Sequence, residues 1–254
     1  MQREDLHLWF VFAEQIREPS LLGSYRRLLT PEERAQEVRF RDPRDQHRYL
    51  LTRALVRTTL SRYVDLPPES WRFVPDEFGR PHIATEGVQA SDLSFNIAHT
   101  RDTIVLGIAR GRALGVDVEG CAGTAPLEVA RRYFSESEAD ALYALSGTAQ
   151  HRRFFEYWTL KEAYIKARGK GLSMPLDQFG FDIDDSPALR FWARPSLDPT
   201  PQVWRFWQLT IGDAQLVAVC VQHTPPKTDI SSARVVVPGI SDEPLPLTIT
   251  RCSH

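Results

Sequence analysis

Two short stretches of the chain combine acidic and basic side chains in a pattern suited to metal and phosphate chemistry. In residues 114–119, apolar residues alternate with Gly115, Asp117 and Glu119, which predicts a strand with both carboxylates on one face. An Asp-x-Glu pair by itself is more often a solvated strand face. On a buried face, however, the two like charges repel, and a divalent cation with oxygen ligands relieves that repulsion.

The second stretch, residues 158–166, predicts a helix in which Glu162 lies one turn before Lys166 and next to Lys161. A Glu–Lys pair at this spacing usually supports a surface helix by only about 0.2–0.5 kcal/mol. Together, the two stretches supply three carboxylates and two lysines, which suffice to bind Mg²⁺ and a diphosphate at once. Their occurrence together, with Trp158 just before the first lysine, favours the functional interpretation.

The pair of stretches resembles the signature of the 4′-phosphopantetheinyl transferases, and more narrowly that of the surfactin-type (Sfp-type) subfamily. The similarity runs from the first predicted strand to about Gln222 and includes three further motifs, at residues 79–81, 95–100 and 169–175. Five motifs in the family's order argue against a chance match. The resemblance implies an α+β fold with two pseudo-symmetric subdomains, each a small, mostly antiparallel sheet with a long helix, and an active site at their interface.

The resemblance also implies an activity. Members of this family transfer the 4′-phosphopantetheine arm of coenzyme A to a serine of an apo acyl or peptidyl carrier protein and release 3′,5′-ADP. The reaction depends on Mg²⁺, with coenzyme A as substrate and the carrier protein as a transient partner. We expect a monomeric enzyme.

Several roles follow from the resemblance residue by residue. Asp117, Glu119 and Glu162 are the expected Mg²⁺ ligands. Glu162 is also the candidate base for the serine proton, with a metal-bound water as the alternative. Lys166 is expected to stabilise charge on the diphosphate in the transition state, and His99 to hydrogen-bond the phosphates of the coenzyme.

The coenzyme site is expected to involve five residues: Arg48, Arg80, His99, Lys161 and Lys166. Arg48 stands at a position that the family uses for the 3′-phosphate, and Arg80 stands where the family usually has lysine. Lys161, which precedes Glu162, is expected to contact the diphosphate or to lie along the coenzyme.

Besides Arg80, three positions depart from the family pattern. Ala98 replaces a serine before the histidine, so one phosphate hydrogen bond is missing or comes from Thr100. Glu33 and Gln36 replace two lysines that contact the 3′-phosphate. Ten arginines but only five acidic residues lie between residues 26 and 62, so Arg48, helped by Arg34, Arg39 or Arg44, is expected to compensate.

The pattern of apolar and turn residues predicts the elements that hold these side chains. Helices are expected after the capping box at Thr30, after Asp42, after Ser135 and from residue 151 to Arg168. Strands are expected at residues 6–13, 71–74, 93–97, 103–109, 179–183, 189–193, 204–210 and 215–221. We predict an N-terminal subdomain at 1–112, a C-terminal subdomain at 113–222 and a poorly ordered or loosely docked tail at 223–254, in which residues 235–237 could add an edge strand.

Composition narrows the alternatives. The net charge is −2 and the pI about 6.4, which does not favour nucleic acid or a membrane surface as a partner. The three widely spaced cysteines form neither a disulfide framework nor a zinc motif, and a cytoplasmic location is expected.

Two other functions stay open. One is a non-catalytic module that binds coenzyme A or a carrier protein. The other is a metal-dependent nuclease, which is disfavoured because Cys121, not lysine, lies two residues after Glu119.

Overall fold

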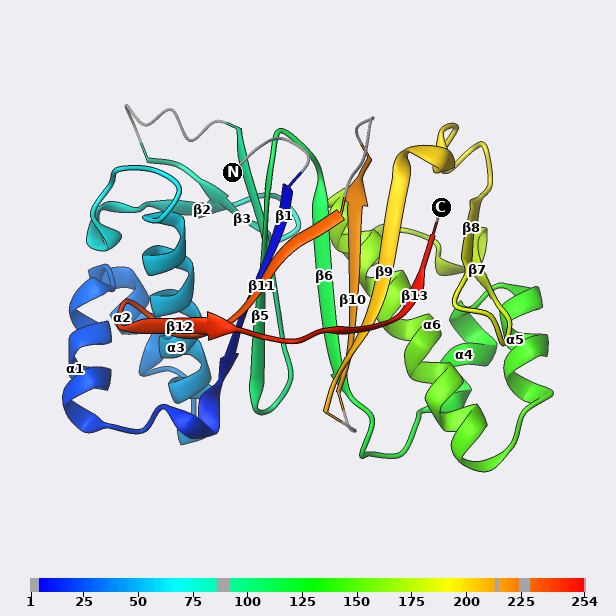
Figure 1. Ribbon diagram of the computed structural model, residues 1–254, viewed down its shortest axis with the longest axis horizontal. Coiled ribbons are helices and arrows are strands. Elements are labelled where there is room, and N and C mark those ends of the chain that lie inside the picture. Colours follow the sequence, from blue (N-terminus) through cyan, green and yellow to red (C-terminus); the bar gives the residue numbers. More distant parts are fainter. Residues whose placement is uncertain (1–4, 86–91, 213–214, 224–228, 254) are drawn as a thin grey trace.

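The computed structural model describes residues 5–85, 92–212, 215–223 and 229–253. Residues 1–4 of the predicted first subdomain, and residues 224–228 and 254 of the predicted tail, lie outside the described residues. Two halves lie side by side, each with a mostly antiparallel sheet and one long helix (Figure 1). The predicted α+β class and its two-part architecture are therefore confirmed.

The first half contains the sheet strands β1 (Asp5–Phe12), β4 (Leu93–His99) and β5 (Thr103–Arg110), the helices α1 (Pro19–Leu28), α2 (Pro31–Glu37) and α3 (Pro43–Leu60), and the hairpin β2 (Phe73–Pro75) and β3 (Pro81–Ile83). The predicted capping box is present at the start of α2, where Thr30 and Glu33 exchange hydrogen bonds with each other's backbone. Asp42 caps α3 as expected. Helix α1 is not predicted from the sequence; it begins with Pro19 after a Glu18 cap, and only Tyr25 of its side chains is fully buried.

The second half contains the strands β6 (Leu114–Gly120), β7 (Phe179–Ile183), β8 (Leu189–Ala193), β9 (Trp204–Ile211) and β10 (Gln215–Gln222), and the helices α4 (Leu127–Tyr133), α5 (Glu136–Tyr143) and α6 (Gly147–Arg168). Helix α6 begins four residues before the predicted start and ends where predicted, because Gly169 adopts the left-handed conformation with φ +65°. Short 3-10 turns, including η3 (Gly171–Ser173) and η4 (Leu176–Gln178), follow it.

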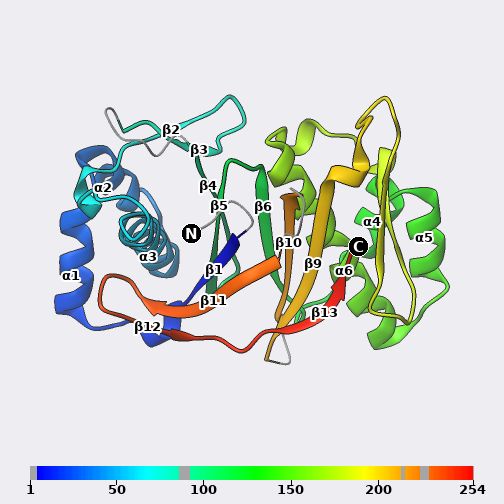
Figure 2. The same ribbon diagram turned by 45° about the horizontal axis from the view of Figure 1, so that its top comes forward.

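The two sheets form the middle of the molecule, with the helices outside (Figures 1 and 2). Alternate residues of β1, β5, β6, β9 and β10 form a shared apolar core between the sheets, for example Leu8, Val116 and Val219. A second apolar cluster lies under α3 and a third under α6. Alternation along β6 therefore sends its valines to the central core and leaves Gly115, Asp117 and Glu119 on the face toward α6.

The halves are joined where one edge of each sheet meets the other. Strand β4 ends one sheet and β6 ends the other, and the backbone N–H of Val116 donates to Asn96 Oδ1 over 2.9 Å. A Cβ on Gly107 of β5 would lie 2.8 Å from a Val116 methyl, so glycine permits this close approach. The edge of β4, with His99 at its end, thus lies beside the strand that carries the two carboxylates.

The C-terminal segment differs from its prediction. Instead of docking loosely, residues 229–252 form three strands: β11 (Asp229–Val237), β12 (Ser241–Pro244) and β13 (Thr248–Cys252). Strand β11 pairs in parallel with β1 and lies between β1 and β12, so it is not an edge strand, and β13 pairs with β9 of the other half. The segment runs across both halves in Figure 1. We call residues 229–253 the C-terminal strap.

None of the helices within the described residues combines the length and the apolar character that a membrane span requires.

Candidate active site

Gly115 determines how closely helix α6 lies on strand β6. A Cβ at this position would lie 2.0 Å from the carbonyl oxygen of Ala163 and 2.4 Å from the backbone nitrogen of Ala167. Such distances are far below van der Waals contact, so only glycine permits this packing. Because Asp117 and Glu119 share the Gly115 face of β6, the close packing brings them to the side of α6 that carries Glu162 and Lys166.

Asp117 is the centre of the cluster. The residue is 6% exposed, and its Oδ1 accepts a hydrogen bond from Lys166 Nζ over 2.7 Å. Its Oδ2 is buried and has no hydrogen-bond partner among the described residues. A buried carboxylate oxygen without a partner is costly, so this atom marks a site that a cation or a donor would stabilise.

The three carboxylates interact electrostatically. Burial raises the pKa of Asp117, and Lys166 opposes that rise. Burial and the neighbouring charge of Asp117 raise the pKa of Glu119 to about 7. The pKa of Glu162 is also raised, first by burial and then by Asp117. Asp117 thus makes ionisation of both glutamates harder, as expected where negative charge is not balanced by enough positive charge.

This donor set fits a hard divalent cation. Three carboxylates offer oxygen ligands, and a single ammonium offsets only part of their negative charge. Within the described ranges, no three His, Cys, Asp or Glu side chains are already arranged around one point as a metal site. Lys166 instead provides the positive charge at Asp117. The predicted ligands are therefore close enough to interact, but their role as ligands stays a prediction.

Trp158 has a contact that the sequence does not predict. It is partly buried, stacks on Phe154 and packs against the core under α6, as expected for a core tryptophan. Its side chain also interacts with the Glu119 carboxyl and lowers the pKa of that group against the effect of burial. The indole therefore favours the ionised form of Glu119.

His99 and Arg48 lie on the first-half side of the cluster. Burial lowers the pKa of His99, and the charges of Arg48 and Lys166 lower it further, while Asp45 raises it. His99 is thus neutral at physiological pH and near both cations. Arg48 donates to Asp45 Oδ1 over 2.6 Å, and its side chain is 21% exposed. Asp45, which the sequence analysis does not single out, holds Arg48 in place one turn along α3.

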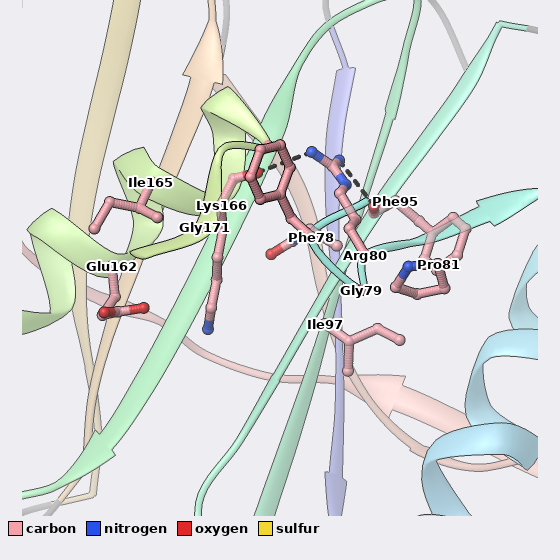
Figure 3. Close-up of a pocket in the computed structure, with 12 residues that line it drawn as sticks. Phe78, Gly79, Arg80, Pro81, Phe95, Ile97, Glu162, Ile165, Lys166 and Gly171 are labelled. Atoms are coloured by element: carbon pink, nitrogen blue, oxygen red, sulfur yellow. Dashed lines mark hydrogen bonds between the residues drawn. The ribbon is translucent and has the colours of Figure 1, made fainter. Parts of the chain in front are cut away.

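A pocket of about 280 Å³ opens beside this cluster (Figure 3). One wall comes from α6 and the turn after it, including Glu162, Ile165 and Lys166. The opposite wall is largely apolar and comes from the β2–β3 hairpin and from β4, with Phe78, Arg80, Pro81, Phe95 and Ile97 among its residues. The pocket therefore joins an apolar surface to the charged residues of α6.

Arg80 lines the pocket, but its guanidinium donates to backbone carbonyls of Lys166, Phe95 and Leu114 over 2.8, 3.3 and 3.2 Å. The expected contact between Arg80 and the coenzyme is therefore not what its side chain makes in this structure.

Lys161 lies elsewhere. The prediction that it contacts the coenzyme is not supported, because its side chain is fully buried in the core below α6. Its ammonium pairs with Glu138 over 2.8 Å and donates to the carbonyls of Leu176 and Phe179, both over 2.7 Å. Successive helix residues point about 100° apart, so the helix turns Lys161 away from the face that carries Glu162.

The two positions that depart from the family's lysines have different environments. Glu33 closes the capping box of α2 and accepts from the fully buried Arg57 over 2.5 Å. It is therefore a structural residue. Gln36, like Arg34 and Arg39, is exposed, and Arg44 pairs with the cap residue Asp42.

Comparison with known proteins follows the same division of the chain. Residues 19–110 match the model "4′-phosphopantetheinyl transferase, N-terminal", and residues 113–220 match the model "4′-phosphopantetheinyl transferase superfamily". The C-terminal strap lies beyond both matched segments.

Individual relatives agree. The chain is 37% identical to 4′-phosphopantetheinyl transferase Sfp of Bacillus subtilis over 153 residues, which are 59% of this chain and 65% of that protein. The match therefore spans slightly less than two thirds of that relative. The chain is also 32% identical to a phosphopantetheinyl transferase of Thraustochytrium over 207 residues, which are 77% of this chain and 70% of that protein. It is 28% identical to 4′-phosphopantetheinyl transferase HetI of Nostoc over 219 residues, which are 86% of this chain and 88% of that protein. On this evidence, the chain belongs to the 4′-phosphopantetheinyl transferase superfamily, among relatives of the Sfp type.

Proposed function

We propose that this protein transfers the 4′-phosphopantetheine arm of coenzyme A to a serine of an apo carrier protein and releases 3′,5′-ADP. The observation that carries the proposal is the cluster at Asp117: three interacting carboxylates, one ammonium and a buried oxygen without a partner among the described residues. Membership in the family supports the same reaction.

Asp117, Glu119 and Glu162 would hold Mg²⁺. When bound, the ion would neutralise charge on the diphosphate and reduce its repulsion from the carboxylates. The unbalanced negative charge of the three side chains and the unpartnered Asp117 Oδ2 support this assignment.

The reaction forms a bond between the serine oxygen and the β-phosphorus and breaks the bond from that phosphorus to the oxygen of the α-phosphate. The serine loses a proton, and we assign Glu162 as its acceptor. Burial and the charge of Asp117 raise the pKa of Glu162, which makes the carboxylate a stronger base. Lys166 stabilises the negative charge that grows on the diphosphate oxygens.

The remaining contacts bind and orient the coenzyme. Neutral His99 donates a hydrogen bond to a phosphate of the coenzyme, and Arg48 binds the 3′-phosphate. The pocket between α6 and the β2–β3 hairpin has apolar walls beside Lys166, which suits the pantetheine arm next to the diphosphate. The proposal also includes an apo acyl or peptidyl carrier protein as the transient partner and the cytoplasm as the location of the enzyme.

The test is incubation of the protein with coenzyme A, Mg²⁺ and a panel of apo carrier proteins, followed by intact mass measurement. We expect one phosphopantetheine group on at least one carrier, and none with the isosteric variant Asp117→Asn. Coenzyme A binding without transfer to any carrier would favour a non-catalytic binding module. Full transfer by Asp117→Asn would contradict the assigned site.

A further inference from the structure

The turn that carries Arg80 is fixed by its own hydrogen bonds. Asp76 Oδ1 accepts the backbone N–H groups of Phe78 and Arg80, each over 2.9 Å, and Gly79 adopts φ +82°, a conformation that favours glycine. A hydrogen bond from the Asp76 N–H to the Arg80 carbonyl closes the turn over 2.9 Å. The hairpin therefore presents Arg80 in a defined direction.

The guanidinium of Arg80 joins three elements that carry the candidate catalytic residues. Its Nη1 donates to the Lys166 carbonyl of α6, and its Nη2 donates to the carbonyls of Phe95 in β4 and Leu114 in β6. Figure 3 shows the bonds to Lys166 and Phe95. Helix α6 carries the base and the lysine, β4 ends at the histidine, and β6 carries two carboxylates. One side chain thus connects both halves at the site.

The bond to α6 lies in the last turn of that helix, where carbonyls lack intrahelical partners. The Lys166 carbonyl also accepts the N–H of Gly169 over 3.2 Å. A cation is favourable at a helix C-terminus, and the guanidinium lies directly beside the Gly169 cap, where an added Cβ would be in ordinary contact with Arg80 Nη1 at 3.7 Å. Arg80 therefore fixes the backbone from which the side chain of Lys166 extends to Asp117.

We propose that Arg80 is a positioning residue, which holds the end of α6 against β4 and β6 so that Lys166 meets the diphosphate in the correct place. This role rests on the proposed function and replaces the expected coenzyme contact. A planar guanidinium with several donors in a fixed fork can span three separated carbonyls. A lysine ammonium keeps the charge but not that span, so Arg80→Lys tests the geometry separately from the charge.

The experiment compares Arg80→Lys with the control Arg72→Lys. Arg72 lies just before the same hairpin, and its side chain donates to the carbonyls of Glu69 and Trp71 in the first half. For Arg80→Lys we expect kcat to fall about tenfold or more, since small misplacements at an active site are costly, with KM for coenzyme A within about twofold. Hydrogen–deuterium exchange should become faster at residues 163–170 and stay unchanged in α3. The control Arg72→Lys should change neither kcat nor the exchange at residues 163–170. Asp76→Ala, which loosens the turn but keeps the guanidinium, should produce the same changes if Arg80→Lys does not fold.

Two outcomes would overturn the proposal: a higher KM with unchanged kcat, which would show a direct coenzyme contact, or unchanged exchange and kcat. The exchange measurement needs no catalysis. If the wild-type protein modifies no carrier, the proposed function fails, and exchange still decides whether Arg80 holds α6.

Discussion

Within the described part of the chain, only one of the two carboxylate oxygens of Asp117 has a hydrogen-bond partner. Lys166 satisfies Oδ1, while buried Oδ2 has no partner among the described residues. A cation that binds only the folded protein would supply the missing partner and stabilise the fold through linkage.

We therefore expect Mg²⁺ to raise the melting temperature of the wild-type protein. At a concentration about tenfold above its Kd, linkage gives about 1.4 kcal/mol, equal to about 3–6 °C for a chain of this size. Asp117→Asn should abolish the shift, whereas Asp185→Asn, on an exposed residue, should keep it. An equal shift in all three proteins would contradict the metal assignment, because it would reflect non-specific binding.

Arg48 is the second residue whose role can be tested alone. The two family lysines that contact the 3′-phosphate are replaced here by Glu33 and Gln36, and Glu33 forms an ion pair with Arg57. We therefore expect Arg48 to bind the 3′-phosphate. One charge-assisted contact contributes about 1.5–3 kcal/mol. Arg48→Ala should therefore reduce the preference for coenzyme A over dephospho-coenzyme A in kcat/KM by about tenfold to a hundredfold. Asp45→Ala is the matched control: it removes the partner of Arg48 but keeps the guanidinium, and should keep most of the preference. If Arg48→Ala leaves the preference unchanged, another residue reads the 3′-phosphate.

At the scale of elements, the site depends on the contact between β6 and α6. Two carboxylates of the cluster come from a strand, whereas the third, which is the proposed base, and the lysine come from a helix; Gly115 sets the separation between the two elements. A side chain there must push α6 outward, because the atoms it meets belong to the helix backbone.

Gly115→Ala should destabilise the protein by about 1–3 kcal/mol through overpacking and reduce kcat by about a hundredfold, as expected for a displacement of about 1 Å. Gly120→Ala on the same strand is the control, since no atom lies within 4 Å of its added Cβ. Denaturant unfolding and kcat would be measured for both variants. Wild-type stability and turnover in Gly115→Ala would show that α6 does not need this close approach.

For the whole molecule, the C-terminal strap connects the two sheets. Val236 of β11 is 2% exposed and belongs to the core under α3. In the other half, the Phe206 backbone N–H donates to Ser253 Oγ over 2.9 Å. Arg62 of the first half also pairs with Asp242 of β12 over 2.5 Å. The strap therefore covers an edge of each sheet.

Deletion of residues 224–254 should lower the melting temperature by about 5 °C or more, because exposing the side chain of Val236 alone costs about 1.5–3 kcal/mol. Hydrogen exchange should become faster in both β1 and β9. Ile240→Ser, a change at a side chain that is 68% exposed, should alter neither quantity. Faster exchange in β1 alone would show that the strap stabilises one half only.

Local sequence patterns determined most of the elements and the identity of the central residues. Alternation predicted β6 with its two carboxylates on one face, capping residues predicted the starts of α2, α3 and α5, and Gly169 predicted the end of α6. Such signals are readable because caps, turns and periodicity depend on residues close in the chain.

Tertiary structure alone decided which of the charged residues share a site. Lys161 and Lys166 are both candidate coenzyme contacts in the sequence, yet only packing shows that the first is buried against Glu138 and the second meets Asp117. Arg80 bonds to carbonyls that lie up to 86 positions away in the chain, and the strap pairs β11 with β1 across more than 200 residues. These contacts depend on how distant segments meet, and backbone carbonyls and strand edges accept partners of almost any sequence, so no local pattern marks them.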